Sequence, residues 1–296
     1  MTIFPFRRIL VGVAHNDADA DLLRYASMLA RLTDQVEFRF VHVFAGGRSH
    51  EAARQQLEQT VREHFSPSEN TVVSVHASHG VRVDRLLELA TEDACDLILV
   101  GHHPDRTGRR SLARRLAMKA PCSVWMAPMG SEARLREVVV AVDFSDPSAL
   151  AVEVATRLAA SARLSRCLAL HVCVEQTEAG DEEQAFDALR DEPVTFEQFL
   201  APLDLGGMRV EQRVAENTSV QQAIQNLGAE CRADLLVMGS RGASPAAAVL
   251  LGSETEHMLR EAKAPVLVVK RSGGPLSLLR ALFDRDFRPN TAPRLS

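Results

Sequence analysis

The sequence contains the same order of apolar segments twice, and this internal repeat limits the possible folds more than any other feature. Four segments of the first half match four segments of the second half in the same order. We therefore predict a tandem duplication with its junction near residues 128–135. The matches pair residues 9–17 with 138–146, 41–43 with 170–172, 96–101 with 234–239, and 120–126 with 264–270.

Short apolar runs alternate with amphipathic segments in each half, which favours a parallel, doubly wound sheet with right-handed crossovers. We expect an α/β fold of two tandem domains, each a five-stranded parallel sheet with helices on both faces. Ligands of such folds bind beyond the carboxyl ends of the strands. The expected strands of the second half are residues 138–142, 168–174, 210–214, 235–238 and 266–269. Four helices are expected in the second half. The first is capped by Asp146, the second spans residues 196–200, the third spans 219–231, and the fourth begins at residue 254.

Length and composition agree with two domains of an intracellular protein. The chain has 296 residues, of which 46% are hydrophobic, and a net charge of −5, so nothing global indicates a nucleic-acid partner. Its five cysteines are odd in number and form no C-x-x-C pair, which indicates free thiols. We find no signal peptide and no apolar stretch near the roughly 20 residues of a transmembrane segment. We expect a cytoplasmic location.

The most informative local pattern follows the apolar run at residues 235–238. Gly239 ends the run, Gly242 follows, and after nine more residues Gly252-Ser253 opens a helical pattern. Glycines can adopt positive φ and let backbone N–H groups approach a ligand, while a helix N-terminus favours a phosphate. Each half of the pattern is common alone, as a turn or a capping box, so the joint spacing carries the information. It is neither a Walker loop nor a dinucleotide fingerprint.

This Gly-x2-Gly-x9-Gly-Ser spacing resembles the nucleotide signature of the universal stress protein family, and the resemblance covers about residues 5–271. Domains of that family have a Rossmann-like sheet of the adenine-nucleotide α-hydrolase type, and many bind ATP. The resemblance implies that the second half binds ATP, AMP or ADP, with Mg²⁺ as the expected companion ion. The residues implied are Val142, Asp143, Val172, Met238, Gly239, Ser240, Arg241, Gly242, Gly252, Ser253 and Thr255.

The implied roles divide between the nucleoside and the phosphates. Asp143 would accept hydrogen bonds from ribose hydroxyls or the adenine amine, and Val142 and Val172 would flank the adenine. Met238 and Gly239 would lie beneath the ribose. The two parts of the phosphate loop would be residues 240–242 and the group Gly252, Ser253 and Thr255.

The first half departs from this signature. Ala14 replaces the acidic residue, and Gly101 is followed by His102-His103-Pro104 where a second glycine would be needed. The loop from Gly101 to Gly108 is also about six residues shorter than its counterpart. We expect this half not to bind ATP in the manner of the family. A basic run could attract an anion or form the solvated face of a helix start. It consists of Arg106, Arg109, Arg110, Arg114 and Arg115.

Histidines gather in the first half, where the topology brings several to one edge of the sheet. Imidazoles in one crevice could bind zinc or another transition metal. His42, however, has a counterpart in the second half, His171, which favours a role in the fold for both. The candidate metal ligands are His15, His42, His102 and His103, with His76 and His79 following the third strand.

The domains expected are a degenerate one at residues 1–130, a nucleotide-binding one at 135–271, and an amphipathic tail at 272–296. Domains of the family pair through their fifth strands. The resemblance therefore implies that residues 124–126 and 266–269 pair within the chain as a pseudo-dimer, and a homodimer is also possible.

Three functions stay open. The first is nucleotide-dependent regulation or stress tolerance without catalytic residues. The second is slow ATP hydrolysis, in which Arg241 and a divalent ion would supply charge. The third is a scaffold that binds no nucleotide and could hold a metal in its first half.

Overall fold

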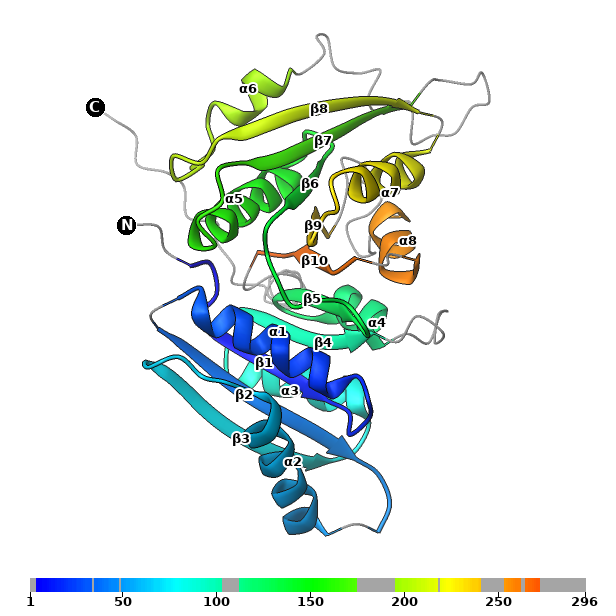
Figure 1. Cartoon of the computed structure of the whole chain (residues 1–296). Helices are drawn as coiled ribbons and strands as arrows, with labels where there is room; N and C mark the ends of the chain where they lie inside the picture. The colour runs from blue at the N-terminus through cyan, green and yellow to red at the C-terminus, as the bar shows by residue number, and fades with distance from the viewer. Residues whose placement is uncertain are drawn as a thin grey trace, which may run out of the picture.

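The computed structural model describes residues 4–33, 35–47, 49–102, 112–174, 195–217, 219–240, 253–261 and 264–271. Figure 1 shows two repeats, one above the other, in which strands and helices alternate. The first repeat contains β1 (Arg8–Val13), α1 (Asp19–Arg31), β2 (Val36–Phe44), α2 (His50–His64), β3 (Thr71–His79), α3 (Arg82–Glu92), β4 (Leu97–His102), α4 (Leu112–Lys119) and β5 (Ser123–Pro128). The second contains β6 (Val138–Val142), α5 (Asp146–Ser161), β7 (Cys167–Val174), α6 (Phe196–Leu200), β8 (Val210–Asn217), α7 (Val220–Glu230), β9 (Leu235–Gly239), α8 (Ser253–Glu261) and β10 (Val266–Val269).

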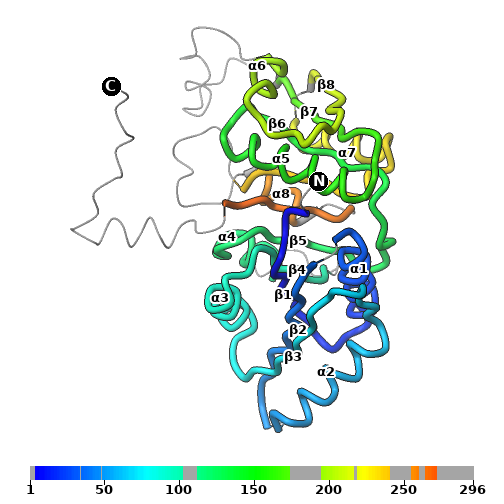
Figure 2. Tube along the Cα trace, turned by 90° about the vertical axis from the view of Figure 1, so that its left-hand side faces the viewer, coloured from blue at the N-terminus to red at the C-terminus, as the bar shows by residue number. Residues whose placement is uncertain are grey.

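The ten described strands form one sheet in the order β3-β2-β1-β4-β5-β10-β9-β6-β7-β8. Neighbours within each repeat are parallel, so the predicted α/β class and the two five-stranded units are confirmed. The fifth strands, β5 and β10, pair antiparallel and place Trp125 opposite Leu267. Figure 2 shows this junction midway along the molecule. The two sheets are therefore continuous.

Helices cover both faces of the sheet, which explains why its inner strands, such as β4, β6, β9 and β10, are almost uninterrupted apolar runs. On one face, α1, α2, α5 and α6 share an apolar cluster that includes Leu22, Leu57 and Leu158. On the other face, α3, α4, α7 and α8 share a second cluster that includes Leu86 and Leu259. Each cluster contains residues of both repeats, so the core does not end at the junction.

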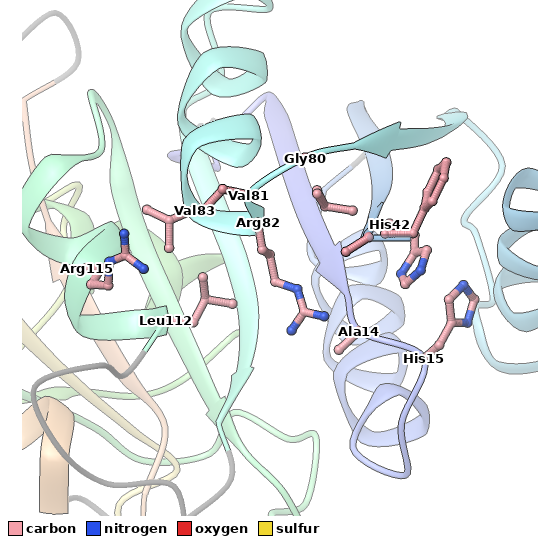
Figure 3. Close-up of a pocket in the computed structure, with 12 residues that line it drawn as sticks. Ala14, His15, His42, Gly80, Val81, Arg82, Val83, Leu112 and Arg115 are labelled. Carbon is pink, nitrogen blue, oxygen red and sulfur yellow. The ribbon is translucent and has the colours of Figure 1, made fainter. Parts of the chain in front are cut away.

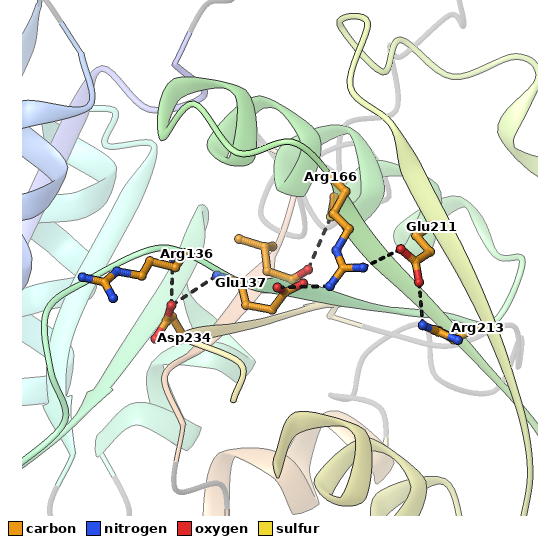
Figure 4. Close-up of polar contacts among 8 residues, drawn as sticks. Arg136, Glu137, Arg166, Glu211, Arg213 and Asp234 are labelled. Atoms are coloured by element: carbon orange, nitrogen blue, oxygen red, sulfur yellow. Dashed lines mark hydrogen bonds and ion pairs between the residues drawn. The ribbon is translucent and has the colours of Figure 1, made fainter. Parts of the chain in front are cut away.

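An aspartate anchors the start of each repeat, and it is half-buried in the first repeat (Asp96) and buried in the second (Asp234). Asp96 Oδ2 accepts the N–H groups of Arg7 and Arg8 at 2.9 and 3.0 Å. Asp234 Oδ2 accepts the N–H groups of Arg136 and Glu137 at 2.8 and 3.2 Å, as Figure 4 shows. These bonds satisfy donors that precede the first strand of each repeat. They explain why both copies of the matched segment begin with aspartate.

Polar contacts reinforce the junction on the side of α4 and α8. Arg114 forms an ion pair with Glu256 at 2.7 Å, which joins these two helices. Lys270 Nζ donates to the carbonyl oxygens of Met118 and Ala120 at 3.2 and 3.0 Å, at the end of α4. A cation at a helix C-terminus is favourable because the last carbonyl groups lack partners within the helix.

Most predicted elements agree with the structure, with two corrections. The strand expected at residues 210–214 continues to Asn217, and the cap of α5 is Ser145 in place of Asp146. No helix of the described part is long and apolar enough to cross a bilayer. The proposed tail at residues 272–296 lies outside the described residues.

Candidate functional site

The strand order reverses between β6 and β9 in the second repeat, and between β1 and β4 in the first. The pairing of β6 with β9 runs from Val138–Leu235 to Val140–Val237, although both strands continue for two more residues. The strands thus diverge at their carboxyl ends. This is the place where doubly wound sheets bind ligands.

Asp143 follows β6 at this point and is half-buried. Its Oδ1 accepts the N–H of Ser145 at 3.1 Å and also the hydroxyl of Ser145. The same hydroxyl oxygen accepts the N–H of Ser148 at 3.3 Å and so caps α5. Among the described residues, no donor reaches Oδ2 of Asp143. The first turn of α5 therefore fixes the carboxylate while one oxygen stays available.

The turn after Asp143 has the same construction in both repeats. Phe144 adopts φ 59° and packs on His171, with ring centroids 4.3 Å apart, and His171 Nδ1 lies 2.9 Å from the carbonyl oxygen of Val142. In the first repeat His15 adopts φ 56°, packs on His42 at 3.9 Å, and His42 Nδ1 lies 3.0 Å from the Val13 oxygen. This equivalence supports a role in the fold for His42.

The histidines do not form a metal site in the described part of the chain. No group of three or more His, Cys, Asp or Glu side chains there is placed to hold an ion. His102 is buried on β4, while His103 lies outside the described residues. A metal site at this edge therefore has no support from the geometry.

Gly239 lies in a close backbone contact. A glycine can adopt a positive φ, but the φ of Gly239 is not positive. A Cβ atom there would lie 2.9 Å from the carbonyl carbon of Pro147 and 3.0 Å from its oxygen. The glycine therefore lets the end of β9 approach the first turn of α5. The next residue, Ser240, donates its N–H to the Val269 oxygen at 3.2 Å.

Thr255 connects the start of α8 with the end of β9. Its buried hydroxyl donates to the carbonyl oxygen of Gly239 at 2.9 Å. Met238 and Val172 belong to the apolar cluster beneath α7 and α8. The structure thus brings seven of the implied residues to one end of the sheet: Val142, Asp143, Val172, Met238, Gly239, Ser240 and Thr255. Arg241, Gly242 and Gly252 lie outside the described residues, and Ser253 is the first residue of α8.

The first repeat has a cavity of about 600 Å³ at the equivalent end of its sheet (Figure 3). Ala14 lies there in place of an aspartate. Of the basic run, Arg115 lines the cavity and Arg114 pairs with Glu256. Arg106, Arg109 and Arg110 lie outside the described residues. The described lining consists of Ala14, His15, His42, Val43, Phe44, Ala45, Gly80, Val81, Arg82, Val83, Leu112 and Arg115.

Comparison with known proteins gives the family. A sequence model of the "Universal stress protein family" matches residues 5–128 and 134–270. The chain belongs to the universal stress protein family. A universal stress protein of Mycobacterium tuberculosis is 35% identical over 150 residues, a match that covers 45% of this chain and 95% of that relative.

Two solved structures show the same fold along most of this universal stress protein. A universal stress protein from Archaeoglobus fulgidus has a TM-score of 0.62 at 18% identity and covers 90% of this chain and 97% of its own. A putative universal stress protein from Pseudomonas aeruginosa has a TM-score of 0.62 at 20% identity, with coverages of 90% and 93%. At these identities the likeness concerns the fold alone.

Sequence reasoning missed several residues that shape the site of this universal stress protein. Ser145 orients Asp143, and its signal was available, because serine before Asp-Pro is a favoured helix cap. Pro147 had no such signal, since its contact with Gly239 joins distant segments. Arg82 belonged to no motif, and only the fold brings it to the cavity that Arg115 lines.

Proposed function

We propose that this universal stress protein binds an adenine nucleotide (ATP, AMP or ADP) in its second repeat and acts in regulation or stress tolerance. The observation that carries this proposal is the carboxylate of Asp143. It lies where β6 and β9 diverge, one oxygen is fixed by Ser145, and the other has no donor among the described residues. An ionised carboxylate in that state is a strong acceptor for a pair of ribose hydroxyls or an exocyclic amine.

The start of α8 suits the phosphate end of such a ligand. Thr255 ties the first turn of α8 to the end of β9, so the helix N-terminus faces the same region as Asp143. The N–H groups and the dipole of a helix N-terminus attract anions. Gly242 and Gly252 carry the sequence spacing of a phosphate loop, Arg241 and Ser253 would add donors, and Mg²⁺ would balance phosphate charge.

The difference between the repeats supports one nucleotide site per chain. In the first repeat the carboxylate comes from Asp19, which accepts the N–H groups of Ala14 and Asn16 at 2.9 and 2.8 Å. It is buried beneath the turn, so the strand end offers an alanine methyl group in place of an acceptor. A ribose would find no carboxylate among the described residues that line this place.

The remaining parts of the proposal concern assembly and location. We infer that the pairing of β5 with β10 replaces, within one chain, a contact between separate domains, because it covers two edges that would otherwise stay open. We also place the protein in the cytoplasm. Its five cysteines are free, as expected in a reducing compartment.

The decisive experiment is calorimetric titration of ATP with Mg²⁺ into protein freed of co-purified nucleotide. Wild type should bind one nucleotide per chain, and Asp143→Ala should bind at least about tenfold more weakly, because hydrogen bonds to a charged acceptor are lost. Asp146→Ala is the matched control, since this exposed carboxylate lies three residues away in the same turn. Equal affinity of all three proteins, or no binding to wild type, would contradict the proposal. Phosphate release in the same samples separates binding from slow hydrolysis.

A further inference from the structure

We propose that the cavity of the first repeat binds a small organic anion with an apolar body, such as a ring compound that carries a phosphate or a carboxylate, and excludes ribonucleotides. The volume of about 600 Å³ lies within the range of small-molecule pockets, about 300–1,000 Å³. The cavity opens where β1 and β2 end and where α3 and α4 begin, so four elements hold its walls.

Two guanidinium groups give the cavity its charge. Figure 3 shows Arg82 extending from the start of α3 between Leu112 and Ala14, with Arg115 on the α4 side. Within the described lining no residue is acidic. Two positive charges that face one cavity repel each other, and a bound anion would remove that repulsion.

Among the described residues, the other two arginines of α3 and α4 have carboxylate partners, unlike Arg82 and Arg115. Arg85, one turn along α3, forms an ion pair with Glu88, and Arg114 pairs with Glu256. In the described part of the chain, no carboxylate pairs with Arg82 or Arg115. Among the described ion pairs of α3 and α4, the two arginines without a carboxylate partner are thus the two that line the cavity. Arginine also suits phosphate and carboxylate better than lysine, because its planar fork donates two parallel hydrogen bonds.

The start of α3 adds backbone donors to the same wall. Its cap residue is Val81, and no side chain caps the first turn. Val81, Arg82 and Val83 all line the cavity, so the uncapped N–H groups and the positive end of the helix lie at its edge. This position reinforces the preference that the two guanidinium groups establish for an anion.

The remaining lining residues indicate which kind of uncharged group the ligand would carry beside its anion. Val43, Phe44, Val83 and Leu112 supply apolar walls that suit a ring or a short hydrocarbon. Ala14 supplies a methyl group where the second repeat has Asp143. The nearby carboxylate of Asp19 already accepts two backbone N–H groups beneath the turn. Among its described lining residues, the cavity therefore offers donors for an anion and no carboxylate for ribose hydroxyls.

The test compares 1-naphthyl phosphate and 1-naphthoate with the uncharged 1-naphthol in titrations of the full chain. Wild type should bind both anions at one site and 1-naphthol at least about tenfold more weakly. Arg82→Gln/Arg115→Gln should lose about tenfold or more in affinity for the anions and keep its affinity for 1-naphthol. Arg62→Gln, an exposed arginine of α2, is the matched control and should bind as wild type.

A second variant tests the same charge effect in case the double substitution prevents folding. Ala14→Asp adds negative charge to the lining and should weaken binding of the two anions while 1-naphthol is unaffected. Equal binding of 1-naphthol and the anions, or unchanged anion affinity in folded Arg82→Gln/Arg115→Gln, would overturn the proposal. The Asp143→Ala protein separates this site from the nucleotide site. Displacement of 1-naphthyl phosphate by AMP in that protein would refute the exclusion of ribonucleotides.

Discussion

Gly239, at the end of β9, lies directly against the backbone of Pro147 in the first turn of α5. This contact fixes the distance between the strand end and α5, whose cap residue Ser145 orients Asp143. The equivalent contact of the first repeat is looser, because a Cβ atom on Gly101 would lie 3.8 Å from that of Ala18. The two glycines match in sequence and differ in the space around them.

Gly239→Ala should therefore destabilise the protein, whereas Gly101→Ala should be nearly neutral. The methyl group at residue 239 would meet backbone atoms that cannot rotate away, and such overpacking costs about 1–3 kcal/mol. Urea unfolding of the two variants measures the difference. Similar unfolding free energies for both would show that the contact with Pro147 relaxes easily.

Leu267→Ala should weaken the junction of the two repeats. Leu267 is fully buried opposite Trp125, and removing a buried leucine side chain costs about 2–5 kcal/mol. Trp125 is the one tryptophan of the chain, so its fluorescence reports on the junction between β5 and β10 during unfolding. Val214→Ala, at a position that is 61% exposed on β8, is the control and should change little. An unshifted unfolding midpoint in Leu267→Ala would contradict the importance of this pair.

Removal of either aspartate that anchors a repeat should destabilise the protein. Asp96→Ala and Asp234→Ala each leave two backbone N–H groups without their acceptor, at a cost of about 1–3 kcal/mol. Thermal unfolding checks this expectation, with the exposed Glu69→Ala as a control for the loss of one negative charge. If only one aspartate variant were destabilised, the anchors would not be equivalent.

The buried thiols should make stability depend on alkaline pH. Burial raises the pKa of Cys95, Cys122 and Cys167 from 9.0 to about 12. The unfolded chain therefore loses these protons first, so the free energy of unfolding should be unaffected by them below about pH 9. It should fall as the pH rises from about 9 to about 12. Burial also raises the pKa of Tyr25, which adds to the same trend.

Chemical denaturation at pH 8, 9 and 10 measures this slope, and Cys122→Ala should reduce it. The same thiols should resist alkylation at pH 8 in the native protein, while the exposed Cys173 reacts. Rapid modification of Cys122 without unfolding would show that the thiol is accessible.

The repeat in the sequence predicted the order of strands and helices because burial on both faces leaves continuous apolar runs. It also predicted that His42 and His171 are equivalent, and both accordingly contact the carbonyl oxygen that ends the first strand. Helix caps were less certain, since Ser145 and Asp146 are both favoured cap residues and only the backbone selects between them.

Contacts between distant segments could not be predicted from spacing. The glycine pattern indicated conformational freedom at Gly239, while the actual constraint comes from Pro147, far away in the sequence. The cavity of the first repeat likewise depends on Arg82 and Arg115, which different helices supply. A single sequence does not show that two such side chains share one cavity.

The antiparallel pairing of β5 with β10 has a consequence for how the two halves are produced. The two repeats that carry these strands are covalently joined through residues 129–137, so the pairing is independent of protein concentration, and dilution cannot separate the halves. Translation of one message yields the repeat with Asp143 and the repeat with the arginine-lined cavity in a fixed one-to-one stoichiometry. Mixed or mismatched pairs of halves, which separate chains would form by chance, do not arise at this junction.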